Sequence, residues 1–201
     1  MPEASLLRWA LALSAALAAG CETAPPPAPS EPAPSTSTAP APPPAPAVSV
    51  IDGHAWTAGM EALAQRLLGV ARAGQVTVQR TEDNRLLVRA TGDSAFESGR
   101  TAVTAGFRQT LDLVASALTE APDTRVQIVG HTDSRGSDAL NNRLSKERAE
   151  STRDYLIARG IAFERLRAEG RGKAEPVADN ATPEGRALNR RVDLLISAPA
   201  P

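Results

Sequence analysis

Residues 130–149 read GHTDSRGSDALNNRLSKERA, and no other stretch of the chain says as much about how it folds. A short run rich in β-branched residues precedes this stretch, at residues 125–129, and alternates apolar with polar side chains as a half-buried strand does. Turn-forming residues fill 131–138, and residues 139–159 combine strong helix formers with no proline. The pattern predicts a strand that ends at Gly130, then a loop, then a helix.

The predicted loop and helix carry two opposite charges. Asp133 lies on the loop, and Arg148 shares a helix face with Leu144 and Thr152 at spacings of four residues. Helical side chains lean toward the N-terminus, and an extended arginine reaches back about 6 Å, roughly one turn. The guanidinium of Arg148 can therefore approach Asp133. Such a pair suits a zwitterion, whose carboxylate takes a forked hydrogen bond from the arginine while its ammonium meets the aspartate.

Spacing alone favours a structural role for both residues. Asp133 would then form an Asx turn or cap the helix, and Arg148 would be its partner. The surrounding motifs shift this balance. Residues 130–133 read Gly-His-Thr-Asp, and residues 141–149 read Asn-x-x-Leu-Ser-x-x-Arg-Ala, with Gly136 between them. Residues 180–192 read Asn-x-Thr-x-x-Gly-Arg-x-x-Asn-Arg-Arg-Val.

These motifs resemble the signature of the OmpA-like C-terminal domain, a peptidoglycan-binding module shared with Pal-type lipoproteins and flagellar stator proteins. The resemblance covers about residues 76–197. It implies that Asp133 and Arg148 hold the diaminopimelate of the peptidoglycan stem peptide, which presents the zwitterionic head described above. Thr152 departs from the family, which usually has valine there, and bears on packing more than on binding.

Further ligand contacts are expected beside this pair. The candidates are Thr132 and Asn141, and the resemblance adds Asn189 and Arg190. Alternation along a strand opening at Asn189 places Arg190 and Arg191 on opposite faces, so that one lines the ligand groove and the other is a solvated surface charge.

The remaining patterns predict an α/β (α+β) two-layer sandwich, with helices packed on one face of a mixed sheet in the OmpA-like order β/α/β/α/β-β. Apolar residues at helical spacing mark two further helices, and proline and glycine mark a short one. The expected helices span about residues 60–71, 103–118 and 183–188. The expected strands span residues 76–79, 86–89, 165–169 and 192–196 in addition to 125–129.

The first 20 residues have the pattern of a secretory signal. Arg8 precedes an apolar run, residues 9–17, that is too short to cross a bilayer, and small residues lead to Cys21. This arrangement resembles a bacterial lipobox, which implies that Cys21 is acylated and begins a mature lipoprotein. Glu22 in place of aspartate favours the outer membrane, by resemblance to other lipoproteins. The alternative is an ordinary cleaved signal followed by an incidental cysteine.

Residues 21–47 are expected to form a disordered tether behind the lipidated cysteine. The stretch from Glu22 to Ala47 is almost wholly Pro, Ala, Ser and Thr and holds 11 of the 17 prolines. At about 3.1 Å per residue it reaches roughly 80 Å. Residues 48–75 are expected to form a linker and an amphipathic helix, and residues 76–197 the OmpA-like domain.

The composition fits one modest core and charged surfaces of both signs. The chain has 201 residues, a net charge of −1 and 42% hydrophobic residues. From Val48 onward, 21 lysines and arginines face 20 aspartates and glutamates. This balance argues against a nucleic-acid or polybasic membrane partner.

Catalytic and metal sites find little support. Only His54 and His131 could supply imidazole, and there is no second cysteine, so neither a metal nor a cofactor is expected. His131 and Asp133 are too close in sequence for a catalytic relay, and His131 is expected to pack beneath the loop. Residues 170–173 read Gly-Arg-Gly-Lys, but the Walker spacing around them is broken.

The sequence therefore predicts a non-catalytic outer-membrane lipoprotein that faces the periplasm and grips peptidoglycan through its folded domain. Other envelope proteins are possible additional partners. The main alternative is an interaction adaptor of the cell envelope that has the same fold without wall binding. A wall-cleaving enzyme is the least favoured class, because no paired acids, zinc ligands or nucleophile and base are present.

Overall fold

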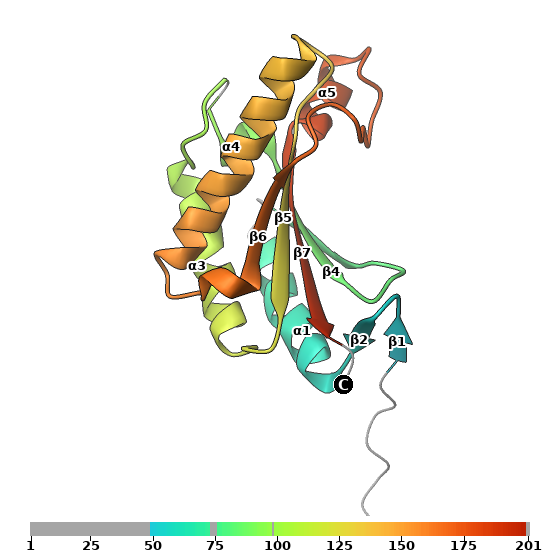
Figure 1. Ribbon diagram of the computed structural model, residues 1–201, viewed down its shortest axis with the longest axis vertical. Coiled ribbons are helices and arrows are strands. Elements are labelled where there is room, and N and C mark those ends of the chain that lie inside the picture. Colours follow the sequence, from blue (N-terminus) through green and yellow to red (C-terminus); the bar gives the residue numbers. More distant parts are fainter. Residues whose placement is uncertain (1–48, 73–75, 98, 200–201) are drawn as a thin grey trace, which may run out of the picture. The chain divides into compact units, whose positions relative to one another are not determined.

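The computed structural model describes residues 49–72, 76–97 and 99–199, which all fall within the unit Pro43–Pro201 (Figure 1). This part of the chain contains a seven-stranded mixed sheet. Its strands are β1 (Ser49–Ile51), β2 (His54–Trp56), β3 (Val76–Arg80), β4 (Leu86–Thr91), β5 (Arg125–His131), β6 (Leu166–Gly170) and β7 (Arg191–Pro199). Its α-helices are α1 (Ala58–Arg72), α2 (Gly92–Ala95), α3 (Ala105–Thr119), α4 (Asp138–Ile157) and α5 (Pro183–Asn189).

Strand β7 organises the sheet. It runs antiparallel to β4 on one side and to β5 on the other. The sheet then extends through β3, antiparallel to β4, and through β6, parallel to β5. The hairpin of β1 and β2 joins the sheet at the last two residues of β7. One parallel pair among antiparallel ones makes the sheet mixed, as predicted.

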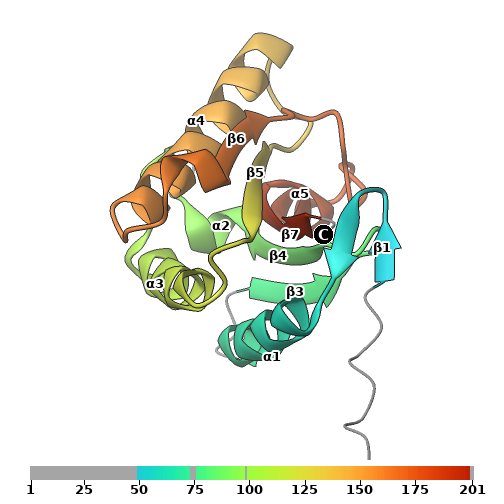
Figure 2. The same cartoon turned by 60° about the horizontal axis from the view of Figure 1, so that its bottom comes forward.

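Helices α1, α3 and α4 lie along the same face of this sheet (Figures 1 and 2). Alternate strand residues such as Val88, Ile128 and Leu194 point into the space between the layers and are buried. The helices contribute buried residues such as Leu67 and Leu111 to the same core. Because this core lies within the unit Pro43–Pro201, we expect that fragment to fold on its own.

The predicted helices and strands are confirmed with small shifts at their ends. The prediction that the strand beginning at residue 125 ends at Gly130 was wrong, since β5 continues to His131. Val103 precedes α3 and forms an isolated bridge with Phe96. The elements that were not predicted are the strands β1 and β2, the four-residue helix α2 and a 3-10 helix at Phe163–Arg165. The dipeptide Asp52-Gly53, with positive φ at both residues, is the sequence signal for the β1–β2 hairpin.

Position 130 of β5 needs a glycine because α4 passes directly over it. A Cβ on Gly130 would lie under 3.0 Å from the backbone of Ser145 on α4. Its neighbour in the sheet, Gly170 on β6, would meet the backbone of Lys146 in the same way. The two glycines let α4 lie against the sheet at this point, only one turn before Arg148.

No helix in the described ranges combines the length and apolar character needed to cross a bilayer.

Candidate functional site

Four charged side chains from separate elements meet at one end of the sheet. Asp133 lies in the loop between β5 and α4, Arg148 on α4, and Arg190 at the residue that joins α5 to β7. Asp93 lies on α2. Figure 1 shows the start of α4 and helix α5 at the same end of the sheet. We refer to Asp93, Asp133, Arg148 and Arg190 as the charge cluster.

Arg190 connects the two aspartates of the charge cluster. Its Nη1 atom donates a hydrogen bond of 2.8 Å to Oδ2 of Asp133. Its Nε and Nη2 atoms donate to the two carboxylate oxygens of Asp93, at 2.9 and 2.6 Å. The hydrogen bonds to Asp93 are the main reason that the pKa of Arg190 is raised. The same bonds hold the pKa of Asp93 below its usual value, so Asp93 is a carboxylate at neutral pH.

Arg148 lies deeper than Arg190 and is only 3% exposed. Its Nε atom donates a 3.0 Å hydrogen bond to the backbone oxygen of Arg100. Its guanidinium carbon lies 5.2 Å from the centre of the Phe96 ring, within the range of a cation–π contact. These two contacts fix the plane of the guanidinium. Neither Nη atom of Arg148 makes a hydrogen bond to any residue that the structure describes.

The environment of Arg148 leaves its charge incompletely compensated. Burial lowers the pKa of Arg148, and the nearby Arg190 lowers it further. Asp93 and Asp133 act in the opposite direction and raise it. A buried guanidinium with free N–H donors is costly unless an anion pairs with it. A ligand carboxylate would therefore be stabilised at the two Nη atoms of Arg148.

The loop that carries Asp133 is fixed by its own hydrogen bonds. Oδ1 of Asp133 accepts from the backbone nitrogen of Arg135 at 2.9 Å, which makes an Asx turn. Asn141 is buried on α4, and its Nδ2 atom donates to the backbone oxygen of Arg135 at 2.9 Å. Ser137 caps α4, its side chain accepting from the nitrogen of Leu140. Asp133 therefore combines the structural role that spacing favoured with a place in the charge cluster.

The backbone of Arg190 packs closely against the first residue of α2. Gly92 donates its N–H to the backbone oxygen of Arg190, and a Cβ on Gly92 would lie under 3.0 Å from that oxygen. This contact places Asp93, the next residue, beside the Arg190 side chain. The short helix α2 thus has a clear part in building the charge cluster.

Two of the predicted ligand contacts, Thr132 and Asn189, make their hydrogen bonds to residues outside the charge cluster. The backbone N–H of Thr132 donates a hydrogen bond to the backbone oxygen of Gly172, and the hydroxyl of Thr132 is buried. The amide of Asn189 accepts two hydrogen bonds, from the nitrogens of Val177 and Ala178, and donates two, to Ala178 and Asn180. All four hydrogen bonds that an asparagine amide can make are used. Asn189 has no free group for a ligand and instead holds the loop before α5.

The prediction that the last strand opens at Asn189 and carries both arginines was wrong, because α5 runs to Asn189 and β7 begins at Arg191. Arg190 enters the charge cluster, whereas the prediction that the other arginine is a solvated surface charge was wrong. Arg191 is buried, with its Nε 3.1 Å from Oδ2 of Asp193 and its Nη2 donating to the oxygen of Glu175. Arg89 pairs with both oxygens of Asp193 at 2.8 Å. This network lies on the face of the sheet opposite the core, and Arg191 links it to the loop that carries Glu175.

His131 packs beneath the loop, as expected. It is 2% exposed, and its Nε2 lies 3.7 Å from Oδ2 of Asp193. Burial lowers the pKa of His131 to about 4, and the positive charge of Arg191 adds to this effect. The imidazole is therefore neutral at physiological pH and serves as a packed polar residue.

Sequence reasoning missed Asp93 and the backbone oxygen of Arg100. Neither carried a readable signal, because α2 has only four residues and a backbone carbonyl is independent of residue type. Cys21, the predicted site of lipidation, lies outside the described residues.

The charge cluster can recognise a small zwitterion. It balances two carboxylates against two guanidiniums, so a ligand with one ammonium and one carboxylate adds no net charge. The carboxylate would meet the free Nη atoms of Arg148, and the ammonium would share the carboxylates with Arg190. Recognition of this kind needs no bond to be made or broken.

Residues 95–190 form an OmpA family domain, since the model of that family matches them. The match includes the charge cluster except Asp93. One relative is the probable lipoprotein YiaD of Escherichia coli, 38% identical over 138 residues, which make up 69% of this chain and 63% of the relative. Another is the peptidoglycan-binding protein ArfA of Mycobacterium tuberculosis, 42% identical over 106 residues, or 53% of this chain and 32% of that protein.

A solved structure agrees with this placement. The cell wall anchor of the T6SS from Pseudomonas aeruginosa is 37% identical, with a TM-score of 0.60 over 68% of this chain and 96% of that structure. The curated relatives are longer than the stretch that matches them, since the matched stretch spans under two thirds of YiaD and about a third of ArfA.

Proposed function

We propose that this protein binds peptidoglycan non-covalently through the charge cluster, with Asp133 and Arg148 holding the diaminopimelate of the stem peptide. The observation that carries the proposal is the buried Arg148, whose two Nη atoms have no hydrogen-bond partner among the described residues while Asp133 and Asp93 stand nearby. A diaminopimelate head supplies the missing carboxylate and an ammonium for the aspartates. The similarity to ArfA, a peptidoglycan-binding protein, and to the Pseudomonas cell wall anchor supports peptidoglycan as the ligand.

The residues have distinct parts in this proposal. Arg148 binds the ligand carboxylate, and Asp133 accepts from its ammonium. Arg190 holds Asp133 in place and is in turn held by Asp93. Asn141 fixes the loop that carries Asp133. No step is catalytic, so binding is the whole activity of the site.

The proposal extends to the parts of the chain outside the described residues. Cys21 would carry the lipid that anchors the protein in the outer membrane, and residues 21–47 would span the distance to the wall. The name of YiaD, a probable lipoprotein, supports this arrangement. Metabolic labelling with a fatty-acid analogue tests it. Label should appear on the parent chain and be absent from Cys21→Ala, and equal labelling of the two would refute acylation at Cys21.

A sedimentation assay with isolated sacculi tests the binding function. The fragment 43–201 should pellet with sacculi, and the Asp133→Ala and Arg148→Ala variants should remain largely in the supernatant. Free diaminopimelate should release the parent fragment from the pellet.

A second ion pair in the fold provides the matched control. Asp112 on α3 and Arg159, just after the end of α4, pair at 2.6 Å on the exposed surface. Asp112→Ala and Arg159→Ala should pellet like the parent. If the Asp133 and Arg148 variants pellet equally well, the site is wrong. Capture of an envelope protein that survives both substitutions and muramidase digestion would favour the adaptor alternative.

A further inference from the structure

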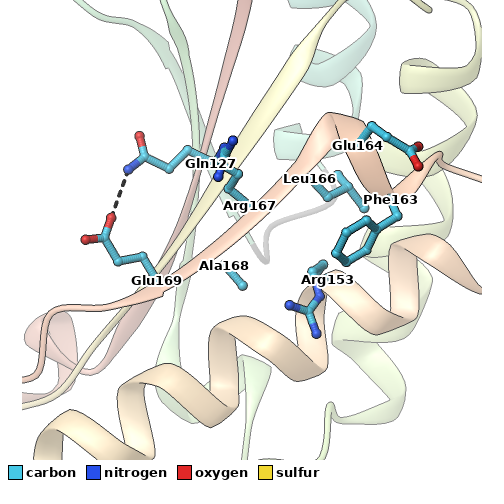
Figure 3. A pocket seen from close by; sticks show the side chains of 8 residues that line it. All are labelled: Gln127, Arg153, Phe163, Glu164, Leu166, Arg167, Ala168 and Glu169. Carbon is cyan, nitrogen blue, oxygen red and sulfur yellow. Dashed lines mark hydrogen bonds between the residues drawn. The ribbon is translucent and has the colours of Figure 1, made fainter.

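Strand β6 forms an open edge of the sheet at a distance from the charge cluster. Within the described part of the chain it pairs only with β5. A cavity of about 430 Å³ follows this edge (Figure 3). It is lined from the open face of the sheet by Gln127, Arg167 and Glu169, and from the α4 side by Arg153, Phe163 and Ala168. Free backbone N–H and C=O groups along such an edge are available to another strand.

The charges on β6 have opposite signs at alternate positions. Arg167 and Glu169 both point to the open face of the sheet, on either side of Ala168 (Figure 3). Arg167 is exposed and makes no hydrogen bond or ion pair with any described residue. Glu169 accepts from Gln127 at 3.1 Å and pairs with Arg171 at 2.9 Å, and a carboxylate has room for a further donor.

This pattern is complementary to itself when a second β6 runs antiparallel. If the two strands cross at Ala168, Arg167 of each copy faces Glu169 of the other on the same face of the joined sheet. The two-fold axis through Ala168 makes both pairs equivalent. A parallel copy in the same register would instead set Arg167 against Arg167 and Glu169 against Glu169. An edge of one sign would repel a second copy in either direction, which is how many proteins prevent pairing.

We propose that β6 pairs antiparallel with β6 of a second copy of this chain, centred on Ala168, to give a two-fold dimer with a continuous sheet. Phe163, 59% exposed at the start of this edge, adds apolar surface beside the contact. Only five residues from each copy form the strand pair, so the dimer is weak and reversible. The charge cluster of each copy stays outside the contact.

A charge-exchange experiment tests both the interface and its register. Sedimentation equilibrium of the fragment 43–201 should show a monomer–dimer equilibrium. Arg167→Glu would bring four negative charges together across the axis of its dimer, and Glu169→Arg would bring four positive ones together. Each variant alone should dimerise at least about tenfold more weakly than the parent.

An equimolar mixture of the two variants, one carrying a fluorescent label, should form a heterodimer. Both acidic side chains of the Arg167→Glu copy would then face the two arginines of the Glu169→Arg copy, which restores two opposite-charge pairs. The mixture separates an interface effect from a folding defect, because two misfolded variants would not restore each other. Arg125→Glu is the matched control: it reverses an exposed charge on the same face of the sheet but on β5, and should dimerise like the parent.

Three results would overturn the proposal. They are a parent fragment that stays monomeric at millimolar concentration, single variants that dimerise normally, and a mixture that remains monomeric. Equal sacculus binding by the parent and both variants is expected, which keeps this result independent of the binding function.

Discussion

Arg190 and Asp133 are joined by a hydrogen bond of 2.8 Å between Nη1 and Oδ2, although 57 positions separate them in the chain. The same guanidinium holds Asp93 through its two other donor nitrogens. The carboxylate proposed to meet a ligand ammonium is therefore already engaged, and the ammonium must share it with Arg190. Asp93 limits this competition, because its carboxylate shares the guanidinium of Arg190 with Asp133.

Asp93→Asn should weaken diaminopimelate binding several-fold. Loss of the Asp93 charge leaves Arg190 with Asp133 as its only anionic partner in the charge cluster, and adds one net positive charge beside the ligand ammonium. Isothermal titration of the fragment 43–201 with free diaminopimelate measures the change. Asp112→Asn, which alters an aspartate paired with Arg159 elsewhere, should leave the affinity unchanged. Unaltered binding by Asp93→Asn would show that Arg190 needs no second carboxylate.

Arg148→Lys should bind diaminopimelate at least about tenfold more weakly, although it conserves the charge. Lysine has no counterpart of the Nε donor that fixes the side chain on the oxygen of Arg100, and it cannot present two parallel donors to a carboxylate. The same titration tests this, with circular dichroism to verify folding. Affinity equal to the parent would mean that charge alone, without the forked geometry, suffices at this position.

Gly130→Ala should destabilise the fold by about 1–3 kcal/mol and impair binding as well, because the new Cβ forces α4 away from the sheet near Arg148. Urea unfolding followed by circular dichroism measures the free energy of unfolding. Gly69→Ala on α1 is the control, since its Cβ meets nothing within 4 Å. That variant should be stabilised slightly, by up to about 1 kcal/mol. Similar results for the two variants would refute the close approach of α4.

Stability should fall as the pH drops from about 6.5 to about 4. The pKa of His131 is lowered to about 4 in the folded protein from an ordinary value of 6.5, so the unfolded chain binds the proton more readily across this range. The neutral histidine's contribution is thus complete above pH 6.5 and lost toward pH 4, by up to about 3 kcal/mol. His131→Gln should flatten this slope in urea unfolding at a series of pH values. An unchanged slope would assign it to other groups.

Much of this architecture was predictable because hydrophobic spacing records which face of each element is buried. The β-branched run before Gly130 and the proline-free stretch after it placed β5 and α4 within a few residues of their actual ends. The elements that escaped prediction are short. Helix α2 has four residues, too few for a periodic pattern, and β1 and β2 have three each.

The charge cluster was predictable only in part. Asp133 and Arg148 lie close in sequence, within one strand–loop–helix unit, so helix geometry indicated their approach. The sequence did not show which of the adjacent residues Arg190 and Arg191 pairs with Asp133. Alternation predicts only that their side chains point in opposite directions, and does not tell which one meets the ligand. The burial of Arg191 depends on Asp193, Arg89 and the loop that carries Glu175, which come from distant parts of the chain.

The sequence by itself determined the order of helices and strands, the motifs of the family and the candidate pair Asp133 and Arg148, because each rests on local spacing. Tertiary structure alone decided that Asp93 clamps Arg190, that Asn189 supports a loop, and that Arg148 is buried with free donors. These outcomes depend on which side chains share a limited volume once the sheet closes against its helices. Charge pairing and burial depend on these tertiary contacts, and no local sequence pattern shows them.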